Sequence, residues 1–201
     1  MFVRTFAGAV AGIDAVAVTV EVNIAGGGLG MYLVGLPDNA VKESEQRIRA
    51  AFENSGERMS GRKVVVSLAP ADLRKEGASF DLPIAVGILA CTRKVNPASI
   101  ADTAILGELA LDGMLRPVRG ALPIAISARG HGVKQMILPA ANAREVSCVD
   151  GIRLIPAQNL DQVVRHLSGA EPIAPIETVG YQALLGQRVY AADFKYVKGQ
   201  K

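Results

Sequence analysis

The chain has 201 residues, half of them hydrophobic, and a formal net charge of +3, which fits one compact domain with a tail. Its apolar stretches are interrupted well before the roughly 18 residues that a membrane-spanning helix needs, and its N-terminus lacks the regions of a signal peptide, so we expect a cytoplasmic protein with no membrane partner. The mild basic charge permits contact with nucleic acid without arguing for it, and Cys91 and Cys148 lack neighbouring ligands for zinc, so no metal is expected.

The first predicted elements are two strands separated by glycines. Residues 15–24 alternate valine or isoleucine with alanine or polar residues, which is the period of a strand with one buried face. The glycine cluster at 26–30 precedes a short apolar strand at 31–34 and predicts a hairpin turn between the two strands. A phosphate cradle is the alternative, but no helix follows the glycines and the chain has no Gly-Lys-Ser/Thr.

A helix is expected to begin at Asp38 or Asn39, whose side chains can cap its free amides, and to end near Asn54. Its inner stripe is apolar (Val41, Ile48, Ala51 and Phe52). Its charged residues place an acid four residues before a base, which predicts a solvated face (Glu43 with Arg47 and Glu45 with Arg49).

Residues 63–68 form a β-branched run that predicts a buried strand. After a turn, Phe80 to about Thr92 predicts a helix with almost no polar face, which has to lie inside the domain. Ser79 or Asp81 is expected to cap this helix. For Asp81 the alternative is a structural ion pair with Arg116 or Arg119.

The second half predicts shorter elements. Residues 104–109 and 113–118 predict the strands of a hairpin around an Asp-Gly turn. Helices are predicted at 120–129, 142–147 and 160–167, the last entered through Asn159, and strands at 135–138 and 152–155. Helices that alternate with strands in this way predict an α/β or α+β fold with a mixed sheet. Beyond Ser168, regularly spaced prolines predict an extended linker.

Two blocks resemble the peptidase domain of Lon-type proteases. The block 106–120, which starts Leu-Gly-Glu-Leu and is followed by a helix and then Ile137-Leu138-Pro139-x-x-Asn142, is similar to the second half of that domain. The turn Gly77-Ala78-Ser79 is similar to its nucleophile turn. The resemblance implies a Lon peptidase-like α+β fold, also described as ribosomal protein S5 domain 2-like, over residues 1–168.

Two further motifs, Val34-Gly35-Leu36-Pro37-Asp38 and Asp193-Phe194-x-x-Val197-x-Gly199-Gln200, resemble the YifB/ComM family of magnesium-chelatase-like AAA+ ATPases. The resemblance implies a Lon-like N-terminal domain at 1–168, a linker at 169–192 and the start of an AAA+ ATPase domain at 193–201. It also implies that the full protein is a hexameric ATPase with ATP and magnesium as cofactors. Such a motor would act as a DNA helicase in branch migration during recombination and natural transformation. Its partners would be its own AAA+ domain and further copies, with DNA binding by this chain left open.

The catalytic pair of a Ser–Lys peptidase is incomplete in this sequence. In the Lon pattern a lysine that takes the serine proton follows Pro-Ile-Gly-Gly-Leu, and the match onto residues 117–121 places this lysine at Leu122, which accepts no proton. Arg119 cannot replace it, because guanidinium stays protonated. We therefore expect Ser79 to be a vestigial nucleophile position that caps a helix, with no catalytic residue and no cofactor in this chain. The alternative is an ATP-independent Ser–Lys peptidase that uses Lys75 or Lys94 as the base.

If this chain contacts DNA, phosphate groups would be met by basic residues near turns. The candidates are Arg62, Lys63, Arg116, Arg119, Arg129 and Lys134. Each is more simply explained as solvated surface, and the low aromatic content argues against a platform on which bases stack.

Overall fold

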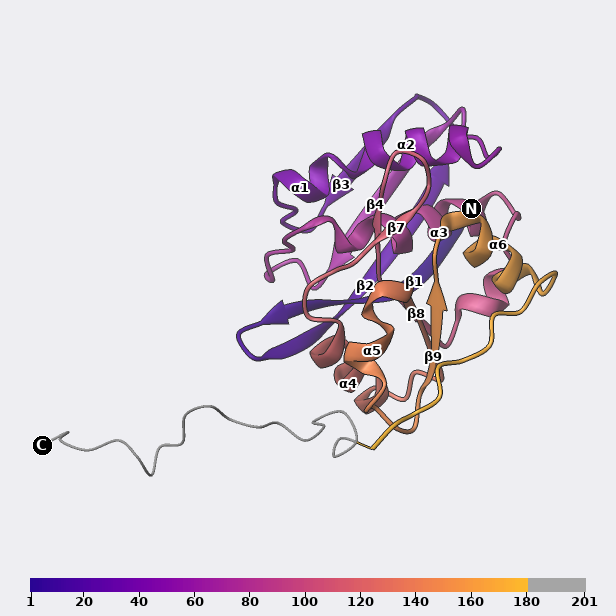
Figure 1. The fold of residues 1–201 in the computed structure, drawn as a ribbon. Coiled ribbons are helices and arrows are strands. Elements are labelled where there is room, and N and C mark those ends of the chain that lie inside the picture. Colours follow the sequence, from indigo (N-terminus) through magenta and orange to yellow (C-terminus); the bar gives the residue numbers. More distant parts are fainter. Residues whose placement is uncertain (181–201) are drawn as a thin grey trace, which may run out of the picture.

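The computed structural model describes residues 1–180, which form a seven-stranded mixed sheet with helices on both faces (Figure 1). The strand order is β3-β4-β2-β1-β5-β8-β9, and every strand except β2 runs in the direction of β1. The strands are β1 (Phe2–Ala11), β2 (Asp14–Ala25), β3 (Met31–Val34), β4 (Lys63–Ala69), β5 (Thr103–Ile105), β8 (Gln135–Pro139) and β9 (Arg153–Ala157). The α+β fold of Lon peptidase-like type, expected from the sequence, is confirmed.

The helices and a small hairpin complete the domain. The α-helices are α1 (Asn39–Lys42), α2 (Ser44–Asn54), α3 (Asp81–Cys91), α4 (Ala121–Gly130), α5 (Ala143–Val146) and α6 (Leu160–Ser168). Short 3-10 turns are η1 (Ala78–Phe80), η2 (Pro97–Ile100) and η3 (Ala140–Asn142). The hairpin pairs β6 (Glu108–Leu109) with β7 (Leu115–Arg116).

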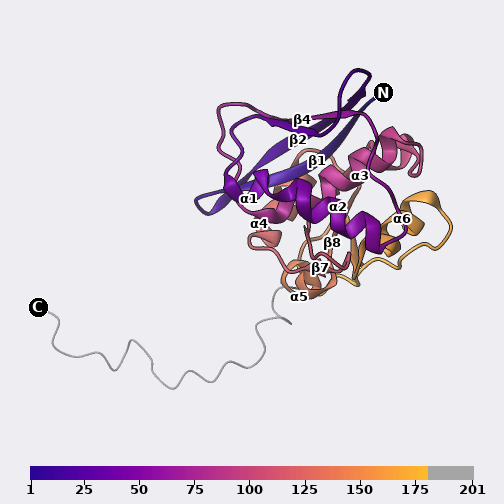
Figure 2. The same ribbon diagram turned by 90° about the horizontal axis from the view of Figure 1, so that it is seen from above.

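Helix α3 is the centre of the main core. Each of its residues is buried, as its apolar sequence predicts, and it packs against β1 and β2 on the face that α2 also covers (Figure 2). Helix α4 packs on the opposite face of the same two strands, and Gly8 permits this approach, since a Cβ there would lie 2.6 Å from Cγ2 of Ile124. The two cores therefore lie on opposite faces of the sheet where α3 and α4 cover β1 and β2.

Strand β1 is an element that the sequence patterns did not predict. Its inward residues include Thr5 and small alanines, whereas Phe2, Phe6 and Val10 lie on the other face. Apolar residues thus lie on both faces of β1. The alternation of apolar with polar residues that indicates a half-buried strand is therefore absent.

Two predicted hairpins need correction. The glycines at 26–30 do not connect neighbouring strands, because β3 pairs in parallel with β4 and so lies on the far side of β4 from β2. The predicted strand 104–109 is divided: β5 joins the main sheet, and only β6 pairs with β7. The loop between β6 and β7 spans 110–114 rather than two residues, and Gly113 adopts a φ of 85° within it.

The remaining predicted elements are present near their expected bounds. The helix predicted from Asp38 or Asn39 to Asn54 is interrupted at Glu43, which separates α1 from α2. Asp38 caps α1 and Asn159 caps α6, as predicted.

The segment after α6 has no helix or strand up to residue 180, but it is tied to the domain by backbone hydrogen bonds. The amide of Ile176 donates to the carbonyl of Leu154 at 2.8 Å, and that of Val179 to Ser147 at 2.9 Å. The rest of the predicted linker (181–192) and the predicted start of an ATPase domain (193–201) lie outside the described residues. None of the helices within 1–180 has the length and hydrophobicity needed to span a bilayer.

Candidate functional site

A groove of about 840 Å³ opens where the end of β1 faces two loops. One loop is the turn 76–79 that contains Ser79, and the other is the segment 117–120 that precedes α4. The fold thus brings the two Lon-like blocks together across one cavity, as the resemblance implies.

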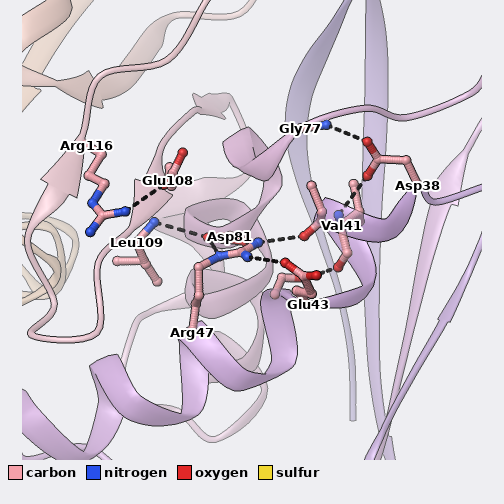
Figure 3. A network of polar contacts seen from close by, with 11 residues as sticks. Asp38, Val41, Glu43, Arg47, Gly77, Asp81, Glu108, Leu109 and Arg116 are labelled. Atoms are coloured by element: carbon pink, nitrogen blue, oxygen red, sulfur yellow. Dashed lines mark hydrogen bonds and ion pairs between the residues drawn. The ribbon is translucent and has the colours of Figure 1, made fainter.

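The turn that carries Ser79 is held by Asp38 (Figure 3). The Oδ2 atom of Asp38 accepts a hydrogen bond from the Gly77 amide at 3.1 Å, and its Oδ1 atom accepts one from the Val41 amide at 2.8 Å. Gly77 has a φ of 82°, a conformation that side chains other than glycine rarely adopt. One carboxylate therefore caps α1 and fixes the entrance to η1; the sequence indicated only its capping role.

Asp81 forms a two-bonded ion pair with Arg47 behind this turn (Figure 3). The Nε–Oδ2 and Nη2–Oδ1 distances are 2.6 and 2.9 Å, and Oδ2 also accepts from the Leu109 amide at 3.2 Å. Burial raises the pKa of Asp81, and the hydrogen bonds and positive charge of Arg47 oppose this rise. The pair links α2, α3 and β6, and its planar fork-to-fork geometry is the strong form of such a contact.

These contacts correct two predictions. Asp81 does not pair with Arg116 or Arg119, and Arg47 does not lie on a solvated face, since its side chain is only 16% exposed. Arg47 does keep its predicted neighbour Glu43, at 3.6 Å. The i,i+4 spacing identified the contact of Arg47 with Glu43. The shorter contact of Arg47, with Asp81, depends on a residue 34 positions away in the sequence.

Ser79 is not a helix cap in the predicted sense. Its carbonyl accepts from the Gly107 amide at 3.1 Å, which joins the two Lon-like blocks directly. No side chain caps η1 or α3, and the partly buried Ser79 hydroxyl lines the groove without a hydrogen bond to another described residue. The hydroxyl is therefore free to face whatever occupies the groove.

The loop 117–120, opposite Ser79, is held by two hydrogen bonds with the buried Asn142. Its Oδ1 atom accepts from the Val118 amide at 3.0 Å, and its Nδ2 atom donates to the Val118 carbonyl at 2.8 Å. Glu145 accepts from the Leu122 amide at 3.2 Å. Leu122 thus stands in the first turn of α4, partly buried and outside the lining of the groove.

The two lysines considered as replacement bases have other partners. Lys75 is fully buried, and its Nζ atom donates to the carbonyl of Pro70. Burial lowers the pKa of Lys75. Lys94 lies 3.8 Å from Glu57. Neither amine has a hydrogen bond to Ser79 among the contacts described for residues 1–180.

The six basic residues considered for DNA binding do not gather in one patch. Arg62 and Lys63 lie at the start of β4, and Arg129 and Lys134 lie near the start of β8, four strand spacings away or roughly 19 Å. Arg116 lies in the separate hairpin of β6 and β7, and Arg119 lies in the loop that precedes α4. Four of the six already have partners: Lys63 lies over the Tyr32 ring, Arg116 pairs with Glu108, Lys134 pairs with Asp102, and Arg129 donates to the carbonyl of Asp150.

Comparison with known proteins defines the family. The family model described as subunit ChlI of Mg-chelatase matches residues 20–142, more than half of the chain. The chain belongs to the ChlI family. Competence protein ComM of Haemophilus influenzae is 41% identical over 167 residues, and uncharacterized protein YifB of Escherichia coli is 40% identical over 158 residues. The expected relationship to the YifB and ComM proteins is confirmed.

A distant relationship to Lon is also present. Peroxisomal Lon protease homolog 2 of Oryza sativa is 26% identical over 164 residues, which cover 72% of this chain and 18% of that protein. The matches to ComM and YifB cover 83% and 79% of this ChlI-family chain but only 32% and 31% of those proteins. The chain therefore spans about a third of the length of these relatives.

Proposed function

We propose that this chain is the non-proteolytic Lon-like domain of a ComM- or YifB-type AAA+ ATPase. The observation that supports this proposal is that the groove is intact while an aliphatic side chain stands at the position of the catalytic base. Ser79 and the loop 117–120 face each other, yet Leu122 replaces the lysine of the Lon pattern and Lys75 is bonded elsewhere. A serine hydroxyl without a proton acceptor is a weak nucleophile.

The full protein is then a hexameric motor that uses ATP and magnesium in its AAA+ domain to drive DNA branch migration as a helicase. This step is suggested by the likeness to a competence protein, and it assigns natural transformation as the process. In this arrangement residues 1–168 are the Lon-like domain, 169–192 the linker and 193–201 the start of the ATPase. Its partners are the AAA+ domain, other copies in the ring and DNA, and its location is the cytoplasm.

The test of the non-proteolytic role is a peptidase assay with the full chain, casein and fluorogenic peptides as substrates, and Ser79→Ala as the matched control. We expect the same background signal from both proteins. Cleavage that Ser79→Ala abolishes would overturn the proposal and favour the Ser–Lys peptidase. The variant Lys75→Met would then show whether the buried amine supplies the base.

The motor role is tested on the full-length protein. We expect ATP hydrolysis that DNA stimulates and unwinding of branched DNA, both retained in Ser79→Ala. Unwinding that fails while ATP is hydrolysed would contradict the helicase assignment and leave the domain assignment in place.

A further inference from the structure

Part of the edge of β1 has no neighbouring strand. On one side β2 pairs with β1 over its whole length, from Phe2↔Asn23 to Ala11↔Asp14. On the other side β5 pairs with it at a single position, Phe6↔Ala104. After β5 the chain turns away from β1, because the Gly107 amide donates its hydrogen bond to the Ser79 carbonyl and not to β1. Within residues 1–180, the stretch 8–11 of β1 therefore ends the sheet locally on this side.

The register shows which peptide groups face the open edge. Met1 and Ile24 exchange two backbone hydrogen bonds, of 2.9 and 2.7 Å. Hydrogen-bonded and non-hydrogen-bonded pairs alternate along an antiparallel ladder, so the odd-numbered residues of β1 bond to β2. The even-numbered residues direct their N–H and C=O groups away from β2. Val10 thus presents both groups at the open edge.

This edge forms one wall of the groove, since Gly8, Ala9, Val10 and Ala11 all line it. Four residues of extended chain measure roughly 13 Å, enough for a short added strand. The Val10 side chain is 47% exposed at the rim. Unpaired donors and acceptors on a strand edge are best satisfied by another extended backbone, which repeats its own N–H and C=O groups at the same spacing.

The charges around the groove add a preference for a carboxylate. Glu76 pairs with Arg74 at 3.1 Å, and Glu108 pairs with Arg116 at 3.3 Å. Arg119 lines the groove and has no acidic partner among the ion pairs of the described residues. Asp38 also lines the groove without an ion pair, but its two oxygens already accept hydrogen bonds from the amides of Val41 and Gly77. Arg119 is therefore the cation of the lining that is left to bind a ligand, and a guanidinium binds carboxylates well.

We propose that the groove binds one extended segment of a different protein, ending in or carrying a carboxylate, as an added strand on β1. The backbone of the segment pairs with the open edge at Val10, and its carboxylate lies against Arg119. The expectation that the bound segment is not cleaved rests on the proposed function. The expectation that it binds rests on the geometry alone.

The probe is a fluorescein-labelled heptapeptide of alternating valine and alanine that ends in aspartate, titrated against the full chain by fluorescence anisotropy. Two further versions carry N-methyl groups on alternate residues: one on the odd-numbered amides and the other on the even-numbered amides. Only one phase of amides faces β1 when the aspartate fixes the register, so we expect the two versions to differ in affinity by about tenfold or more. Equal affinities for both versions, or no binding of the unmethylated peptide at millimolar concentration, would overturn the proposal.

Protein variants test the same two contacts. Val10→Pro removes the amide that faces the groove and leaves the bonds to β2, whereas Val10→Thr keeps that amide and a similar shape. We expect about tenfold weaker binding with proline and little change with threonine. Arg119→Gln is expected to weaken binding of the aspartate peptide but not of the same peptide ending in asparagine amide, which has no carboxylate. The N-methylated peptides still decide the matter with the unaltered protein if Val10→Pro fails to fold.

Two further readouts separate the alternatives. Mass spectrometry of the bound peptide detects cleavage, which would refute the proposed function and still support binding in the groove. Sedimentation of the chain without peptide detects self-association, and a dimer that the peptide dissociates would assign the groove to a second copy and overturn the proposal.

Discussion

The guanidinium of Arg47 and the carboxylate of Asp81 join α2 to the first turn of α3 through two hydrogen bonds, of 2.6 and 2.9 Å. Asp81 is only 1% exposed. Removing one partner from a buried pair leaves an uncompensated charge, whereas removing both leaves an apolar contact.

The first prediction follows from this pair. Asp81→Ala should lower the free energy of unfolding by about 3–5 kcal/mol, measured by urea denaturation, and the double variant Arg47→Met/Asp81→Leu should recover most of that loss. The pair of Glu45 with the exposed Arg49 is the control, because Arg49→Ala should change stability by less than about 0.5 kcal/mol. Equal losses in the two single variants would refute a structural role for the buried pair.

A second prediction concerns Asp38 and the turn that carries Ser79. Asp38→Ala removes acceptors from the amides of Val41 and Gly77, so it should lower stability by about 1–2 kcal/mol. Hydrogen exchange at the Gly77 amide should become faster by more than the change in global stability explains. Asn159→Ala, which removes the cap of α6, is the matched control and should leave exchange at Gly77 unchanged relative to global stability.

The third prediction is a dependence on pH set by His166. Its Nδ1 atom accepts a hydrogen bond from the Ile173 amide at 3.0 Å, and burial, with a contribution from Arg153, lowers the pKa of His166 below its ordinary 6.5. His166 therefore binds a proton more readily in the unfolded chain than in the folded one. The free energy of unfolding should fall as the pH decreases from about 7 through the ordinary histidine pKa.

Thermal denaturation between about pH 7.5 and 5 checks this slope. His166→Gln should reduce it, because the titrating group is removed. The exposed His131, replaced by glutamine, is the control for the substitution itself. An unchanged slope in His166→Gln would contradict the assignment.

A fourth prediction contrasts two glycines with positive φ. At Gly35, with φ of 102°, an added Cβ would overlap the carbonyl oxygen of Leu68, so Gly35→Ala should destabilise the domain by more than about 3 kcal/mol or prevent folding. At Gly12, with φ of 66°, the same Cβ meets open space, and Gly12→Ala should lower stability by about 1 kcal/mol. Urea denaturation measures both, and similar losses would contradict the steric explanation.

The sequence predicted elements whose signals are local. The apolar run 80–92 contains a fully buried helix, and the stripe of α2 faces the core. It did not predict strand β1, since its apolar side chains lie on both faces, nor the parallel pairing of β3 with β4, which depends on a crossover. Asp38 and Asn142 were visible only as a cap and as part of a motif, because their second contacts lie 39 and 24 residues away.

By itself the sequence determined which side chains are available: a serine in a glycine turn, and a leucine where the Lon pattern has its lysine. Their chemistry is a property of residue type and needs no fold to be known. Only the tertiary structure decided which groups meet. The pairing of Arg47 with Asp81, the partner of the buried Lys75 and the open edge at Val10 all depend on strands and helices distant in the chain, because burial and strand order are set by packing of the whole domain.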